Sequence, residues 1–181
     1  MKELSLNILD ITENSVKAGA TLTEIYVDEV GETLTLTIKD DGCGMDEETV
    51  KSVTDPFYTT RKTRKVGLGI PLLKLACEQT GGRLSITSSV DEASHGTTVT
   101  ATFFKNHIDF TPLGDVISSI VTLIQGHPDT DFLFRHSTER GSVELDTREI
   151  RAVLEDVPLD TYEVILWIRE SLGEQYNELT I

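Results

Sequence analysis

Apolar positions recur at two different spacings along the chain, and each spacing predicts one kind of element. Apolar residues three or four positions apart predict a helix over Leu4–Lys17. Apolar and polar residues alternate instead in TEIYVDE (23–29) and in TLTLTIK (33–39), which predicts two strands. The segment VGE between them suits a hairpin turn, so the two strands are expected to pair antiparallel.

The same two signals continue along the next part of the chain. Further helices are expected over residues 46–53 and 70–80, and further strands over 83–89 and 96–104. The order is then a helix, two strands, two helices and two strands. This order predicts an α+β fold, arranged as a two-layer α/β sandwich, and not an alternating parallel fold.

Residues 107–181 are expected to form a small acidic α+β appendage to residues 1–106. They hold 5 Lys and Arg against 15 Asp and Glu. The apolar run 164–168 around Trp167 is expected to be buried, against the first domain or another chain. The appendage either completes the core or docks a partner. The elements expected in it are helices over 112–126, 148–157 and 160–176 and strands over 131–138 and 142–147.

Composition and charge narrow the class of protein. A chain of 181 residues that is 38 % hydrophobic can bury a core, and its net charge of −15 argues against nucleic acid bound through a general basic surface. No segment reaches the roughly 20 apolar residues that span a bilayer, and the first residues lack a signal peptide's apolar run. Cys43 and Cys77 form no CxxC pair, so neither a disulfide nor a zinc site is expected. We therefore expect a cytoplasmic protein without a membrane partner.

Two groups of polar residues are candidates for a binding site. The first is Asp10, Glu13, Asn14 and Lys17, which share one stripe of the first predicted helix. This stripe is either a solvated face or a site in which an amide oxygen and phosphate oxygens hold Mg²⁺ while a carboxylate acts on water. The second is the segment KDDGCGM (39–45). It is either a polar turn or part of a binding site, in which one of its carboxylates accepts a hydrogen bond from a ligand amine. Its spacing does not match an EF-hand.

Five segments, in the order ENSVKAGA, DDGCGM, PFYTTRK, GLGI and HGTTV, resemble the sequence boxes of the GHKL superfamily. These are the Bergerat-fold ATPases, which include sensor histidine kinases, MutL proteins, gyrase B, Hsp90 and anti-sigma kinases. The resemblance covers about residues 4–104 and is that of a stand-alone histidine kinase-like ATPase domain. It implies the Bergerat fold with ATP and Mg²⁺ as ligands.

The resemblance also implies roles for single residues. Asn14 would bind Mg²⁺, Lys17 a phosphate, and Asp40 the adenine amine, while Asp10 would be the catalytic residue. Residues 55–66 would form a mobile lid over the nucleotide. The full set implied for nucleotide binding is Asn14, Lys17, Asp40, Gly42, Gly44, Met45, Thr59, Thr60, Arg61, Lys62, Gly67, Leu68, Gly69, Thr97 and Thr98.

Two departures from the family pattern affect the expected activity. Asp10 stands where hydrolysing members carry a glutamate, and Glu13 directly precedes Asn14. Since aspartate is one methylene shorter, slow hydrolysis is expected. The boxes begin almost at Met1, so a complete sensor kinase is not expected.

Two classes of function remain after these arguments. The chain is either a slow ATPase or protein kinase, or a non-catalytic binding module that regulates a partner protein according to its bound nucleotide. The expected partners are ATP or ADP and a protein of unknown identity. A homodimer is left open.

Overall fold

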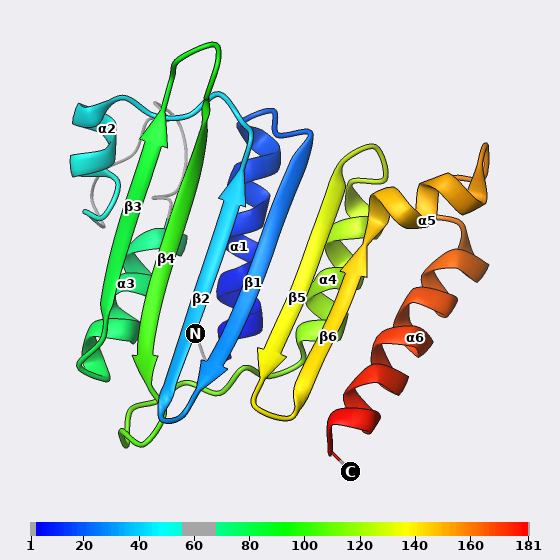
Figure 1. Ribbon diagram of the computed structural model, residues 1–181. Coiled ribbons are helices and arrows are strands. Elements are labelled where there is room, and N and C mark those ends of the chain that lie inside the picture. The colour runs from blue at the N-terminus through cyan, green and yellow to red at the C-terminus, as the bar shows by residue number, and fades with distance from the viewer. Residues whose placement is uncertain (1–2, 56–67, 181) are drawn as a thin grey trace.

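Six strands form one mixed sheet in the computed structural model, which describes residues 3–55 and 68–180 (Figure 1). The strand order is β3-β4-β2-β1-β5-β6, and all neighbours are antiparallel except the parallel pair β1 and β5. The strands are β1 (Leu22–Val30), β2 (Thr33–Asp40), β3 (Arg83–Ser89), β4 (Gly96–Phe104), β5 (Asp131–Thr138) and β6 (Gly141–Asp146).

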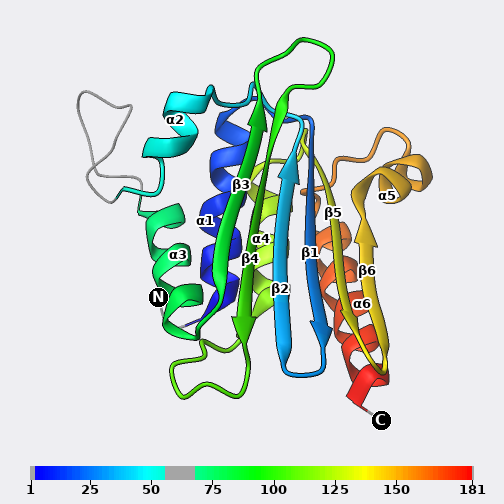
Figure 2. The ribbon, with the colours of Figure 1, turned by 60° about the vertical axis from the view of Figure 1, so that its left-hand side comes forward.

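Helices cover one face of this sheet, which confirms the predicted two-layer sandwich (Figure 2). Along the helical layer α1 packs between α3 and α4, and α4 also contacts α6. None of the helices in the described ranges is both long enough and apolar enough to cross a membrane. The helices are α1 (Leu4–Lys17), α2 (Glu47–Ser52), α3 (Gly69–Gln79), α4 (Val116–Gly126), α5 (Thr147–Leu154) and α6 (Tyr162–Thr180).

The sequence periodicities explain how the two layers meet. In β2 the alternating residues Leu34, Leu36 and Ile38 are buried, while the threonines between them lie on the other face of the sheet. The helical spacing of Leu4 and Ile8 places both on the buried side of α1. The core is therefore the apolar face of the sheet closed by the apolar stripes of the helices.

Residues 107–181 continue the same sheet and the same core. Strand β5 pairs with β1 through contacts such as Thr23 with Phe132. Phe132 and Ile120 are fully buried and belong to one hydrophobic cluster with Leu36 of β2. This part of the chain therefore completes the core. The predicted division into two domains after residue 106 stays a prediction.

The helix expected over 112–126 begins only at Val116, because the preceding residues serve α1. The carbonyl oxygens of Pro112 and Leu113 accept the backbone N–H groups of Leu4 and Ser5, at 2.9 and 2.8 Å. Gly114 has a φ of +73°, which is incompatible with a helix. This loop thus caps the first turn of α1, whose N–H groups have no partner within their own helix.

The predicted burial of the run 164–168 is wrong for two of its residues. Val164 and Ile168 are buried, but Leu166 and Trp167 are 41 % and 54 % exposed. A helix turns by about 100° per residue, so five consecutive residues cannot all face the core. Trp167 is therefore a surface residue of α6.

Candidate functional site

The carboxylate of Asp40, the last residue of β2, is held by three hydrogen bonds. Its Oδ1 accepts the backbone N–H groups of Gly42 and Thr97, at 2.9 and 3.2 Å. Its Oδ2 accepts the hydroxyl of Ser15 on α1, at 2.7 Å. A carboxylate has roughly four acceptor positions, so Oδ2 keeps one for a further donor. Asp40 is therefore an oriented acceptor where β2, β4 and α1 meet.

The neighbouring Asp41 has a different role. It accepts the backbone N–H groups of Thr21 and Leu22, at 2.7 and 2.9 Å, and the Thr21 hydroxyl. Burial acts to raise the pKa of Asp41, but the hydrogen bonds from Leu22 and Thr21 outweigh it and hold this pKa below its usual value. Asp41 thus ties the end of β2 to the loop between α1 and β1, and Asp40 alone serves the candidate site.

Glycines allow the backbone around Asp40 to pack closely. A Cβ on Gly42 would lie 2.9 Å from the Ala18 Cβ, and one on Gly44 would lie 1.8 Å from the Ser89 carbonyl oxygen. Gly44 also has a φ of +72°, which favours glycine. His95 Nδ1 lies 2.7 Å from the Gly42 carbonyl oxygen and fixes this loop against the turn between β3 and β4.

A hydroxyl network behind Asp40 joins the predicted residues Met45 and Thr97. Ser88 on β3 accepts the Met45 N–H at 2.8 Å and donates to the Gly96 carbonyl oxygen at 2.9 Å. The Ser88 and Thr97 hydroxyl oxygens are 2.8 Å apart. Successive residues of a strand face opposite sides, so Thr98 lies on the sheet face away from Thr97. The structure thus brings Thr97 and Met45 together and leaves Thr98 apart.

The first turn of α3 lies against the exposed side of α1. A Cβ on Gly69 would be 3.4 Å from the Asp10 Cβ and 3.8 Å from Nδ2 of Asn14. Within the described ranges, neither the Asp10 nor the Asn14 side chain has a hydrogen-bond or ion-pair partner. Both exposed polar groups therefore lie beside the N-terminus of α3, where N–H groups and the helix dipole favour an anion.

Glu13 and Lys17 turn toward another part of the molecule. The Glu13 carboxylate lies 2.7 Å from Nε2 of His127, which follows α4, and 3.6 Å from the Lys17 amine. The predicted stripe on α1 is therefore divided. Asp10 and Asn14 face α3, while Glu13 is paired on the α4 side.

Part of the predicted site lies outside the described residues. This applies to Thr59, Thr60, Arg61, Lys62 and Gly67 and to the predicted lid from residue 56 onward. Leu68 is described, is 45 % exposed and precedes α3 without capping it through its side chain. In the part of the chain that the structure describes, no cluster of three or more His, Cys, Asp or Glu side chains could hold a metal ion.

Sequence reasoning missed three residues of the site, namely Ser15, Ser88 and His95. Ser15 immediately follows the predicted Asn14, and its position four residues after Ile11, on the apolar stripe of α1, is the sequence signal that could have found it. Ser88 lies on β3 and His95 in the turn before β4, and no sequence motif or spacing marks either residue as part of a site. They become site residues only because β3 and β4 pair beside Asp40.

The two-layer sandwich, with its polar site between the end of β2 and the first helix, defines the Bergerat class of ATPase fold. The chain belongs to the family of histidine kinase-, DNA gyrase B- and HSP90-like ATPases, whose profile matches residues 2–107. The resemblance inferred from the sequence boxes is thereby confirmed.

Two relatives each match about half of the chain. A putative sensor protein of Shewanella frigidimarina is 30 % identical over 97 residues, which cover 51 % of this chain and 15 % of that protein. Sporulation kinase C of Bacillus subtilis is 29 % identical over 94 residues, which cover 52 % of this chain and 22 % of the kinase. The chain thus spans less than a quarter of the length of either relative.

A likeness in fold extends further along the chain. The crystal structure of the N-terminal domain of a DNA repair protein matches with a TM-score of 0.60 and 16 % sequence identity. The match covers 81 % of this chain and 52 % of the DNA repair domain. Residues 1–107 make up less than two thirds of this chain, so they cannot account for the whole match. The shared fold therefore includes part of residues 108–181.

Proposed function

We propose that this chain binds Mg-ATP or Mg-ADP where α1, the end of β2 and the start of α3 meet. The observation that carries the proposal is the Asp40 carboxylate, oriented by three hydrogen bonds with an acceptor position left on Oδ2. The exocyclic amine of adenine is a donor that this position would accept. Membership of an ATPase family supports the same ligand.

The residues beside α3 would hold the phosphate end of the nucleotide. Asn14 would supply an amide oxygen to Mg²⁺, an ion that takes oxygen ligands and keeps several waters. The first N–H groups of α3, at Gly69 and Ile70, would face the phosphates. They are available for this because the N-cap residue Leu68 makes no side-chain hydrogen bond to the helix. Lys17 would have to leave Glu13 to reach a phosphate, since the two are paired at 3.6 Å.

We further propose slow turnover, as an ATPase or protein kinase, with Asp10 as the group that orients or deprotonates the attacking nucleophile. Bound Mg²⁺ would neutralise charge on the phosphate oxygens. Glu13 is a weaker candidate, because its carboxylate is 2.7 Å from His127 and lies on the α4 side. The alternative is a non-catalytic, nucleotide-gated module that regulates a partner protein, which the short side chain of Asp10 supports. A cytoplasmic location and a homodimer stay predictions.

Calorimetric titration with Mg-ATP and Mg-ADP tests the proposed site, using Asp40→Asn. The amide oxygen can still accept from Gly42 and Thr97, while its NH₂ group replaces the acceptor at Oδ2. A loss of roughly 1.5–3 kcal/mol is expected, which is about 10- to 150-fold in Kd. Asp41→Asn is the matched control and should bind as the wild type does. Equal affinity in the wild type and Asp40→Asn would remove the proposed site.

A second experiment separates the enzyme from the binding module. Purified protein is incubated with labelled ATP, with and without candidate partner proteins, and scored for free phosphate and for phosphoprotein. Either product, lost in the Asn14→Ala variant, would support the enzyme. Nucleotide binding without either product would support the binding module.

A further inference from the structure

An apolar groove of about 580 Å³ opens at the β6 edge of the sheet, between β6, α5 and α6. Two apolar side chains that line the groove are largely exposed to solvent, Val153 by 83 % and Trp167 by 54 %. Exposed apolar side chains gathered in a hollow are typical of an interaction surface. The apolar lining consists of Leu145, Ile150, Val153, Leu154, Val164 and Trp167.

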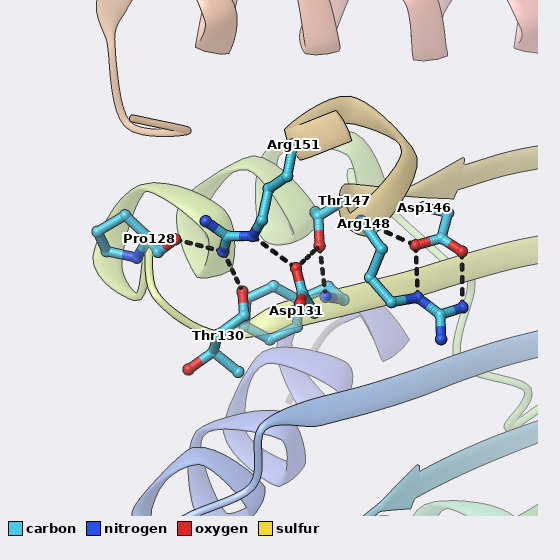
Figure 3. Close-up of polar contacts among 8 residues, drawn as sticks. Pro128, Thr130, Asp131, Asp146, Thr147, Arg148 and Arg151 are labelled. Carbon is cyan, nitrogen blue, oxygen red and sulfur yellow. Dashed lines mark hydrogen bonds and ion pairs between the residues drawn. The ribbon is translucent and has the colours of Figure 1, made fainter. Parts of the chain in front are cut away.

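The α5 wall of this groove is held in place by partly buried polar contacts (Figure 3). Arg151 of α5 donates to Asp131 Oδ1 at 2.7 Å and to the carbonyl oxygens of Pro128 and Thr130, at 2.5 and 3.2 Å. Thr147, the first residue of α5, donates to the same Asp131 oxygen at 2.8 Å. The groove is therefore preformed, which lowers the entropic cost of binding.

Acidic side chains surround the apolar lining. Glu144, Glu149 and Glu163 all line the groove, and among the described residues none of the three has an ion-pair partner. Asp146 also lines it, but Arg148 neutralises this carboxylate through two hydrogen bonds of 2.9 and 2.7 Å (Figure 3). The rim thus carries uncompensated negative charge, which complements Lys and Arg on a partner.

The edge of β6 indicates the shape of the partner. Gln175 of α6 accepts the backbone N–H of Glu144 at 2.8 Å and donates to its carbonyl oxygen at 3.1 Å. These are the backbone groups on the free side of the edge strand, so an added strand would have to displace Gln175. A helix that lays an apolar face between α5 and α6 needs no such displacement.

We propose that this groove binds an amphipathic helix of a partner protein, with an aliphatic face in the groove and Lys or Arg on its flanks. A second copy of this chain is a poorer occupant, because the net charge of each copy is −15. The proposal does not depend on nucleotide binding. The groove belongs to β6, α5 and α6, whereas the candidate nucleotide site belongs to α1, β2 and α3.

Trp167 makes the proposal directly testable, because it is the only tryptophan of the chain. The probe is a designed helical peptide with a leucine face and lysine flanks, titrated in the absence of nucleotide. We expect a saturable blue shift of Trp167 emission, since the indole moves from water into an apolar contact. An isomeric peptide with glutamate flanks should bind at least roughly tenfold more weakly, and added salt should weaken the lysine peptide.

Variants separate the groove from the rest of the surface. Val153→Asp places a charge in the groove and should abolish the shift, while folding is preserved because the side chain is 83 % exposed. Ile108→Asp is the matched control, since Ile108 is 95 % exposed elsewhere on the surface, and it should leave binding unchanged. The pair Glu149→Lys and Glu163→Lys should weaken the lysine peptide and strengthen the glutamate peptide. Circular dichroism checks that each variant is folded.

Several outcomes would overturn the proposal. They are the absence of a blue shift with the lysine peptide, equal binding of both peptides, and equal binding by the Val153→Asp and Ile108→Asp variants. Sedimentation that shows a dimer of the wild type, lost in Val153→Asp, would assign the groove to a second copy instead. Because no nucleotide is present, a failure of the nucleotide proposal would leave these results unchanged.

Discussion

The Glu13 carboxylate lies 2.7 Å from Nε2 of His127, whereas Asp10 lies against Gly69 at the start of α3. A helix turns by about 100° per residue, so Glu13 leaves α1 about 60° from Asp10 on one side, while Asn14 leaves it about 40° from Asp10 on the other side. Asp10 is therefore the acid that shares a surface with Asn14.

We predict that Asp10→Glu raises ATP hydrolysis and that Asp10→Asn abolishes it. A general base must reach its water within about 2.6–3.2 Å, and a misplacement on the order of 1 Å can cost roughly a hundredfold in rate. The added methylene of Asp10→Glu should recover part of this lost rate, while the amide of Asp10→Asn cannot accept a proton from the attacking water. Phosphate release and nucleotide affinity are measured for each variant, and affinity should stay unchanged.

Glu13→Gln is the matched control for Asp10, because it changes an acid on the same helix that is paired with His127. It should keep any hydrolysis of the wild type. Hydrolysis that survives Asp10→Asn but is lost in Glu13→Gln would transfer the role to Glu13. No hydrolysis in any variant would favour the kinase or the binding module.

Gly96→Ala should reduce both stability and nucleotide affinity. Gly96 has a φ of +137°, and a Cβ would lie 2.1 Å from the Asp40 carbonyl oxygen. The strain should cost roughly 1–3 kcal/mol and shift Asp40. Urea unfolding and calorimetry with Mg-ATP measure the two effects.

The control for Gly96 is Gly173→Ala, at a position inside α6 where a Cβ would meet no atom within 4 Å. It should raise the free energy of unfolding by roughly 0.5–1 kcal/mol, because glycine is unfavourable within a helix. Nucleotide affinity should not change. If Gly96→Ala were as harmless as Gly173→Ala, the close approach of β4 to Asp40 would be wrong.

Asp41 should make stability depend on pH in the acidic range. Its pKa is lower in the folded protein, so its contribution is present above the unfolded value of about 3.9 and is lost as pH falls through the folded value. Asp41→Ala should therefore cost about 1 kcal/mol at pH 7 and less at pH 3. Unfolding by urea at both pH values measures this, and an equal cost at both would contradict the role of the carboxylate.

Tyr176→Phe should loosen the contact between α6 and the sheet. The Tyr176 hydroxyl lies 2.8 Å from Nδ1 of His136, and Nε2 of that ring lies 2.9 Å from a Glu29 oxygen. Because His136 is buried, removing its partner should cost roughly 1–3 kcal/mol. Tyr162→Phe, at a position 74 % exposed, is the control and should cost much less.

The same tyrosine predicts a dependence on alkaline pH. Burial, assisted by the negative charge of Glu29, raises the pKa of Tyr176. A raised pKa favours the neutral phenol in the folded state, so this stability is present below the unfolded value of about 10 and is lost as pH rises through the folded value. The cost of Tyr176→Phe in urea unfolding should thus be smaller above pH 10 than at pH 7. An undiminished cost would contradict this.

The local elements could be predicted because their signal is periodic. α1 and β2 bury residues at helical and at alternating spacing, and both were located almost to the residue. The same reasoning failed at residues 112–115, where the chain serves α1 instead of continuing α4 backward. It also failed at Trp167, because an unbroken apolar run hides which side of a helix faces water.

The candidate site was only half predictable for a related reason. Asp40 and Asn14 stand in recognisable sequence boxes, but two of the three groups that orient Asp40 come from other segments. Ser15 is 25 residues away in sequence, and the Thr97 N–H is 57 residues away. Such contacts follow from the pairing of β2 with β4 and of α1 with the sheet, which no local pattern specifies.

The parallel pairing of β1 with β5 also bears on the order in which the chain folds. Strand β1 meets β2 after a short hairpin, but its other neighbour begins at Asp131, more than 100 residues after Leu22. Contacts so distant in sequence form slowly. On the ribosome, that edge of β1 therefore stays uncovered until β5 has been synthesised, and an uncovered strand edge is a template for aggregation.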